Sequence, residues 1–456
     1  MNARLLRIET RRGVGMAAFP VLIGLAWWST HDRLPSGGTV WLDLSLNIGS
    51  SMLFLAPAAA ALTAWMAGRD RRRRMDDLLA TTPLPPIRRE LAAWAGTSLW
   101  PTLAYLAAGS YVMVMAMREA TWGGPPLSPI LVGLLTVVMG AAVGFTAGTL
   151  VPSRFTAPLV AIALFFSLGW MPNAEVVPWR LRLLSPLHFL DFEGYSVLFG
   201  LKPDRGGPIA VWLVGITISA LAIVAFRHGL SGRAGAALTI GVGLIVAGLA
   251  LTSPDRTMDH AAAADVVPYA PVCGGTAIPV CVHPAYEAWL PRTARLVDSL
   301  VSPLAGIPGV PERATQYASQ FGPPPVGTLN LQWVIDDDRL EYWLSQSIAL
   351  ELVGAPGSHH GSSPAPPQPS QSVVAIWLIR QAGQDPALPE TFVEAVEWDL
   401  LPFTPELTLD QRNTELRDIM DAVNRFAALD VASQRAWLEA HYSDLVAGRL
   451  HLKDLP

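Results

Sequence analysis

The sequence predicts an α-helical polytopic membrane domain, followed by a mostly α, α+β soluble domain that is extracellular. Three observations support this fold class. Hydrophobic residues make up 51% of the 456 residues, which is more than a soluble protein of this length normally carries. Seven uncharged apolar runs lie in the first 254 residues. The charges are also divided, because residues 1–254 carry 20 Lys+Arg and 12 Asp+Glu (net +8), whereas residues 255–456 carry 12 and 25 (net −13).

The apolar runs define the membrane part of the chain. They are residues 13–29, 46–67, 91–117, 129–150, 155–172, 208–226 and 234–252. Most reach the roughly 20 residues that a helix needs to cross a bilayer, although the first and the fifth are short. No Asp, Glu, Lys, Arg or His lies near the middle of any run. Because ion-coupled carriers usually need ionisable groups at that depth, the sequence argues against a secondary carrier.

The positive charges predict how the spans are oriented. Fourteen Lys and Arg residues fall in the connections on one side, and six fall in those on the other. Because such residues near span ends stay in the cytoplasm, the N-terminus is expected there, and residues beyond 254 are expected outside. The expected organisation is a cytoplasmic amphipathic helix at 1–12, a six-span domain at 13–233, a seventh span at 234–252 and an extracellular domain at 253–456. The expected location is the plasma membrane.

A short basic segment between the second and third spans is the candidate functional site. Residues 69–90 read RDRRRRMDDLLATTPLPPIRRE. The middle of the segment has the spacing of a short helix with Met75, Leu78 and Leu79 on one side. The residues expected to contact a cytoplasmic partner are Arg71, Arg72, Arg73, Arg74, Met75, Asp76, Asp77, Leu78 and Leu79. A topology anchor without a partner is the alternative interpretation.

The span pattern and this segment resemble the membrane subunit of an ABC-2-type transporter. The resemblance covers about residues 1–230 and includes the stretch DLLATTPL at 77–84, which follows the arginines. It implies a six-span bundle with a coupling helix after the second span, a partly re-entrant outer segment at 173–207, and a pathway formed with a second copy or a homologue. It also implies that ATP and Mg²⁺ bind to a separate ATPase subunit, with no cofactor in this chain. The resemblance further implies export, and the apolar, uncharged spans favour an amphipathic or hydrophobic cargo, such as a drug, lipid or peptide, over a sugar chain.

The seventh span and the C-terminal domain lie outside this resemblance, and the domain contains both cysteines of the chain. Cys273 and Cys281 lie in CGGTAIPVC, within the segment assigned to the oxidising side of the membrane, where disulfides persist. Zinc ligation with His283 and Glu287 is the alternative, but no second ligand pair follows. A disulfide is therefore the favoured interpretation.

The fourth span carries a stripe of small residues. Gly140, Gly144 and Gly148 recur at every fourth position and so lie on one side of a helix. Such a stripe lets two membrane helices approach closely. Ordinary packing within one subunit is favoured over a special site.

The C-terminal domain is expected to combine helices with short strands. Helices are predicted at 338–353, from Thr408 onwards and at 430–447, and strands at 328–335 and 372–379. Residues 355–371, rich in Pro and Ser, are expected to form a flexible loop. We find no H-E-x-x-H, G-x-S-x-G or phosphate-binding loop, so no catalytic residue and no enzymatic activity are predicted. The alternative is a membrane-anchored extracellular enzyme or sensor whose activity lies in 255–456; no nucleic-acid partner is expected.

Overall fold

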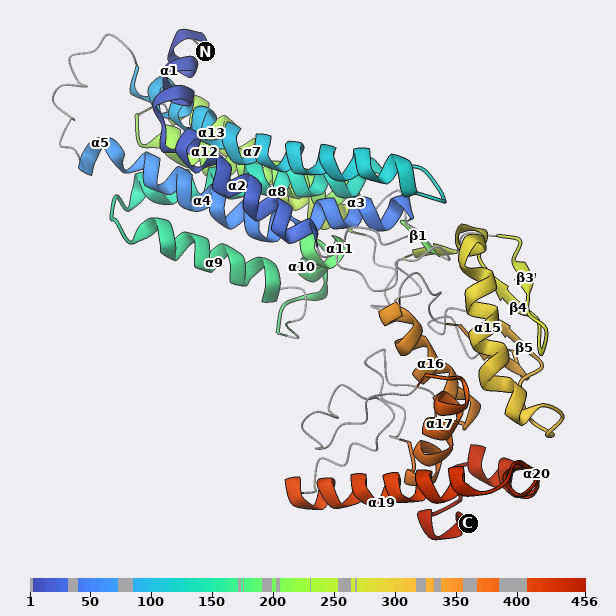
Figure 1. Ribbon diagram of the computed structural model, residues 1–456. Helices are drawn as coiled ribbons and strands as arrows, with labels where there is room; N and C mark the ends of the chain where they lie inside the picture. The colour runs from blue at the N-terminus through green and yellow to red at the C-terminus, as the bar shows by residue number, and fades with distance from the viewer. Residues whose placement is uncertain are drawn as a thin grey trace. The chain divides into compact units, whose positions relative to one another are not determined.

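The computed structural model divides the chain into two compact units, a helical unit and a C-terminal unit that begins after Val267 (Figure 1). The structure describes residues 3–31, 40–72, 85–170, 174, 176–190, 199–201, 206–229, 231–252, 264–266, 269–316, 325–331, 338–355, 367–384 and 408–456. Each unit has buried apolar residues of its own, so each has a separate core.

The helical unit is a bundle of apolar helices joined by connections of varying length. Its helices are α1 (Ala3–Arg12), α2 (Val14–His31), α3 (Trp41–Ser50), α4 (Met52–Ala67), α5 (Arg69–Arg72), α7 (Pro86–Glu119), α8 (Leu127–Leu150), α9 (Thr156–Trp170), α10 (Trp179–Leu183), α11 (Pro186–Leu190), α12 (Gly206–Phe226) and α13 (Ser231–Leu251). Strand β1 (Phe199–Leu201) pairs antiparallel with β2 (Ala264–Val266). Helix α8 packs against both α4 and α12, and α7 packs against α1 and α2 (Figure 1).

Five helical segments of the described chain are long and apolar enough to cross a membrane. They are Trp41–Ala67, Pro86–Arg118, Leu127–Leu150, Gly206–Phe226 and Gly232–Leu251. Two further apolar helices, Val14–Thr30 and Thr156–Trp170, are shorter, and they correspond to the two predicted runs that are short in the sequence. The segment Trp41–Ala67 starts five residues before the predicted run 46–67, because α3 precedes α4 and only Ser51 separates them. The chain is a multi-pass membrane protein.

Small residues bring α4 and α8 into close contact. Three glycines of α8 face three alanines of α4; the pairs are Gly140 with Ala56, Gly144 with Ala60 and Gly148 with Ala64. A Cβ atom on Gly140 would lie 2.6 Å from the carbonyl oxygen of Ala56, and a Cβ atom on either other glycine would overlap its neighbour more severely. The glycine stripe therefore packs two helices of one subunit together, as small-residue stripes commonly do in membranes.

The connection between α9 and α12 contains the two short helices α10 and α11. Helix α11 contacts α3, α8 and α9, and four of its five residues are buried. The side chain of Leu190 fills the space beside Gly49 of α3, where an added Cβ atom would lie 2.6 Å from it. Within the segment expected to be partly re-entrant, the described residues thus include a short helix that packs into the bundle.

The C-terminal unit combines a small mixed sheet with helices. Strands β3 (Val272–Gly274), β4 (Val280–Val282), β5 (Arg313–Thr315) and β6 (Thr328–Asn330) lie in that order; β3 and β4 are antiparallel, and the two other pairs are parallel. The helices are η1 (Pro284–Trp289), α15 (Leu290–Val301), η2 (Ser302–Leu304), α16 (Asp338–Leu352), α17 (Pro369–Gln381), α19 (Leu409–Ala428), α20 (Val431–Val446) and η4 (Leu452–Asp454). A single apolar core joins β4, β5 and β6 to α15, α16, α17, α19 and α20.

Three predicted helices of this unit are present, and two of them have the N-caps that the sequence indicates. Helix α16 lies within the predicted range 338–353. Helix α19 begins after Thr408, whose backbone N–H donates to the Gln411 side chain at 2.9 Å. Helix α20 begins after Asp430, whose carboxylate accepts the Ser433 backbone N–H at 3.0 Å. These bonds satisfy N–H groups that have no partner within a helix, which explains why the chain turns helical there.

The strand predicted at 372–379 is wrong, because this segment lies in helix α17. The side chains of residues 370–379 are all buried, so the run has neither the alternation of a strand nor the one-sided stripe of a surface helix. The helix start is marked by Pro369 at its first position and by Gln368, whose backbone N–H donates to the Gln371 side chain at 2.8 Å. The loop predicted at 355–371 is also too long, since α17 begins at 369; residues 356–366 lie outside the described chain. The predicted strand 328–335 is present as β6, which ends at Asn330.

The expected disulfide joins Cys273 and Cys281. The two residues lie directly opposite each other on β3 and β4, and Gly275 turns the chain with φ +98°. The carboxylate of Asp298 on α15 accepts the backbone N–H groups of Thr276 and Ala277, both at 2.9 Å. The hairpin is therefore closed by a covalent bond and attached to the neighbouring helix.

A partly buried carboxyl group makes the stability of the C-terminal unit depend on pH. Glu351 of α16 accepts the backbone N–H of Asn330 at 2.8 Å, but burial outweighs this bond and raises its pKa from 4.5 to about 7. The fold therefore favours the protonated form. The contribution of Glu351 to the free energy of unfolding is complete below about pH 4.5 and is lost as the pH rises through about 7.

We expect Glu351→Gln to raise the unfolding temperature of the full-length protein at pH 8 and to change it little at pH 4.5. A pKa of about 7 in the folded state, against 4.5 in the unfolded state, corresponds to a destabilisation of at most about 3 kcal/mol at high pH. The glutamine keeps an acceptor for Asn330 without the charge. The exposed Glu287→Gln is the matched control, and equal shifts for the two variants at pH 8 would contradict the role of burial.

Candidate functional site

One end of the helical unit carries charged residues around a cavity of about 140 Å³. The cavity lies among the ends of α4, α5, α7, α8 and α12. We call it the charged cavity, and its charged lining residues are Arg69, Asp70, Arg71, Arg89, Glu90, Arg227 and His228. Met66, Ala93 and Phe145 supply apolar walls. The site therefore lies where the apolar bundle meets its polar connections.

Arg69 and Asp70 of α5 connect this helix to α1 and α7 through ion pairs. The guanidinium of Arg69 contacts both oxygens of Glu9 on α1, each at 3.4 Å, and its Nε contacts Asp70 at 3.2 Å. Asp70 in turn lies 3.9 Å from Nε of Arg89 in the first turn of α7. The side chains of Arg69 and Glu9 are only 23% and 11% exposed, so water screens this pair less than an ordinary surface pair.

A second set of contacts connects α7 and α8 to the turn after α12. The imidazole Nε2 of His228 lies 2.9 Å from a carboxylate oxygen of Glu90. The neighbouring Arg227 donates to the carbonyl of Thr149, in the last turn of α8. Helix ends that are far apart in the sequence are thus held together through charged side chains.

The N-terminal helix α1 is fixed against α7 at the same end of the bundle. The indole N–H of Trp100 donates to the Thr10 carbonyl at 3.1 Å. Gly96 allows this approach, because an added Cβ atom would lie 3.0 Å from Glu9 and 3.1 Å from the backbone nitrogen of Thr10. Helix α1 is therefore linked to α7 by packing and to α5 by the ion pair with Arg69.

Two of the predicted contact residues lie in the described chain, and both are on α5. Arg71 lines the charged cavity, whereas Arg72 stacks on Trp65, with its guanidinium carbon 4.2 Å from the ring centroid. Arg73 to Leu79 lie outside the described residues. The described chain stops at Arg72, one residue after the cavity residue Arg71, and resumes at Pro85, four residues before the cavity residue Arg89.

Sequence reasoning assigned no role to the acidic and imidazole members of the network. Glu9, Glu90 and His228 were available as signals, because each lies within two residues of an arginine and close to the end of an apolar run. Their partners could not be read from the sequence, since Glu9 and Arg69 are 60 residues apart.

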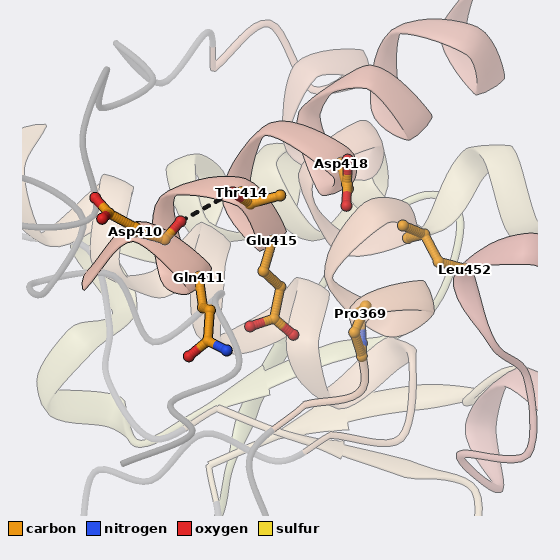
Figure 2. Close-up of a pocket in the computed structure, with 7 residues that line it drawn as sticks. All are labelled: Pro369, Asp410, Gln411, Thr414, Glu415, Asp418 and Leu452. Atoms are coloured by element: carbon orange, nitrogen blue, oxygen red, sulfur yellow. Dashed lines mark hydrogen bonds between the residues drawn. The ribbon is translucent and has the colours of Figure 1, made fainter. Parts of the chain in front are cut away.

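A second pocket lies in the C-terminal unit, with a volume of about 500 Å³. Figure 2 shows Asp410, Glu415 and Asp418 along α19, together with Gln411, and Pro369 and Leu452 beside them. Burial and the nearby charge of Asp418 raise the pKa of Glu415. No basic residue is among the described lining residues, so the pocket favours cationic groups over anions.

Neither pocket contains a recognisable catalytic or metal centre. Within the described ranges, no group of three His, Cys, Asp or Glu residues could hold a metal ion. No family model matches the chain, and no curated protein or solved structure is significantly similar to it. The function must therefore be argued from the membrane topology and from the charged cavity.

Proposed function

We propose that the chain is the permease subunit of an exporter of the ATP-binding cassette type, driven by a separate ATPase. In this proposal two copies, or one copy and a homologue, form the pathway. The segment 69–90 lies on the cytoplasmic side and contacts the ATPase. The support comes from the multi-pass helical unit, from its resemblance to ABC-2-type permeases and from the network around the charged cavity.

The observation that carries the proposal is the set of ion pairs made by the described residues that flank the segment 73–84. On one side, Asp70 of α5 contacts Arg89 of α7 at 3.9 Å. On the other, the neighbouring Glu90 contacts His228 beyond α12. A force transmitted to these flanking residues would therefore reach α1, α7 and α12 together, because Arg69 also contacts Glu9 of α1. Such a joint is what a transporter moved by a partner requires.

The distribution of charge within the spans agrees with an external energy source. In the described apolar helices, Asp, Glu, Lys, Arg and His occur only near the ends. Proton- and ion-coupled carriers usually place such groups within the membrane. Apolar spans also suit an amphipathic or hydrophobic cargo, such as a drug, lipid or peptide.

Purification of the full-length chain from its native membrane tests the proposal. We expect a nucleotide-hydrolysing subunit to copurify, and we expect ATP to drive movement of a fluorescent lipid analogue across liposomes that contain both chains. Liposomes without the ATPase provide the control. Full transport by the chain alone would show that its energy does not come from such a partner.

The second candidate is an extracellular sensor or enzyme that the helical unit anchors. The acidic pocket on α19 favours the sensor, because three carboxylates could bind a cationic ligand. The described residues include five apolar segments long enough to cross a membrane and two shorter ones, which exceeds what an anchor needs and favours transport. Specific binding of a cation by the full-length chain, without any associated ATPase, would favour the sensor.

A further inference from the structure

The charged cavity contains more positive charge than its own carboxylates neutralise. Four arginines and two carboxylates line it, which leaves a net charge of +2 when His228 is neutral. Asp70 is shared by Arg69 and Arg89, and Glu90 contacts His228. All of the acidic lining residues are therefore already engaged with other partners.

Arg71 and Arg227 carry the excess charge. In the described part of the chain, neither guanidinium has a carboxylate within ion-pair distance. Arg227 uses one donor on the carbonyl of Thr149, and its remaining N–H groups are available. Both side chains are exposed and line the cavity from different helix ends, so a ligand between them would meet donors from two directions.

We propose that the charged cavity binds a phosphate group, with Arg71 and Arg227 as its principal donors. Guanidinium groups bind phosphate through paired, charge-assisted hydrogen bonds. A volume of about 140 Å³ is several times what one water molecule occupies, so it can admit a phosphate. This inference goes beyond the proposed function and does not depend on it, since binding requires no ATPase.

The surroundings of the cavity favour the phosphate of an anionic phospholipid. Met66 and Phe145 are apolar walls, and the residues next to Thr149 and Arg227 in the chain are the exposed Leu150 (52%) and Phe226 (39%). Polar donors thus adjoin exposed apolar side chains, which acyl chains could contact. Basic pockets between membrane helices are known to hold anionic lipid head groups in this way.

Native mass spectrometry of the full-length protein in detergent tests the proposal. We expect phosphatidylglycerol to bind more tightly than phosphatidylcholine. We expect R71Q/R227Q to weaken phosphatidylglycerol binding roughly tenfold or more, because two charge-assisted donors are lost. R118Q/R180Q is the matched control, because it removes the same charge from residues that do not line the cavity. Arg118 lies in the last turn of α7, at the opposite end of the helix from the cavity residue Arg89. The control should bind phosphatidylglycerol as the wild type does.

Two further measurements separate the possible sources of the phosphate and guard against misfolding. The wild type could bind inorganic phosphate that R71Q/R227Q does not bind, and show no preference for phosphatidylglycerol. This result would support the site and assign it a soluble ligand. The single variant R71Q should fold, because Arg71 is exposed, and it should also bind more weakly. If R71Q retains full affinity, or if the wild type binds neither probe specifically, the proposal is overturned. ATP-driven transport plays no part in these readings, so their failure leaves the proposed function intact.

Discussion

Replacing Gly144 by leucine should prevent the helical unit from reaching its native packing. A Cβ atom at this position already overlaps the backbone of Ala60 on α4, and leucine adds three further carbon atoms. Overpacking a core costs about 1–3 kcal/mol when side chains can yield. Here the obstacle is the backbone of the neighbouring helix, so we expect a loss at the upper end of that range or above it. The yield of folded protein after detergent extraction and the midpoint of thermal unfolding measure this effect.

Gly243 provides the matched control, because it lies in the interior of the apolar helix α13 and an added Cβ atom would meet nothing within 4 Å. Gly243→Leu should leave the unfolding midpoint unchanged or raise it slightly, because leucine has open space there and a higher helix propensity than glycine. The two alanine variants should shift the unfolding midpoint in opposite directions. Helix propensity favours alanine over glycine by about 0.8–1 kcal/mol, so Gly243→Ala should raise the midpoint. Gly144→Ala should lower it, because the overlap with Ala60 outweighs this gain. Equal midpoints for the two leucine variants would show that the contact between α4 and α8 is not close.

Hydropathy located the apolar helices because a membrane leaves the backbone few alternatives. Every N–H and C=O in the hydrocarbon region needs an internal partner, so a long apolar run must become a helix. The same reasoning located the glycine stripe, although it did not identify α4 as the partner. A signal was available there, since Ala56, Ala60 and Ala64 repeat with the same spacing as the three glycines.

The sequence was less informative where a residue's partner decides its role. Charges beside spans indicate topology, but they do not reveal that Glu9 pairs with Arg69 or that Glu90 lies beside His228. The same limit explains α17. A segment that is buried on all sides shows no period, and a run rich in Val, Ile and Trp then reads as a strand. The capping residues at 368–371 were the better guide, because their hydrogen bonds are local.

Replacing both Leu78 and Leu79 by aspartate should uncouple ATP hydrolysis from transport under the proposed function. These residues supply most of the apolar side of the predicted short helix at 74–79. A contact formed by two leucines loses roughly 3–6 kcal/mol of apolar burial, and the new charges oppose docking further. We expect transport per ATP hydrolysed to fall at least about a hundredfold, measured in liposomes that contain the chain and its ATPase.

Thr81→Asp/Thr82→Asp is the matched control for this prediction, because it adds the same two charges to the same segment without removing an apolar side chain. The control should keep most of the coupling, whereas both variants should insert normally, since a more acidic loop still contains seven arginines. If the control uncouples as strongly as the leucine variant, charge and not the apolar side governs the contact. If neither variant changes transport, the segment is a topology anchor, and the force must enter the helical unit at another surface.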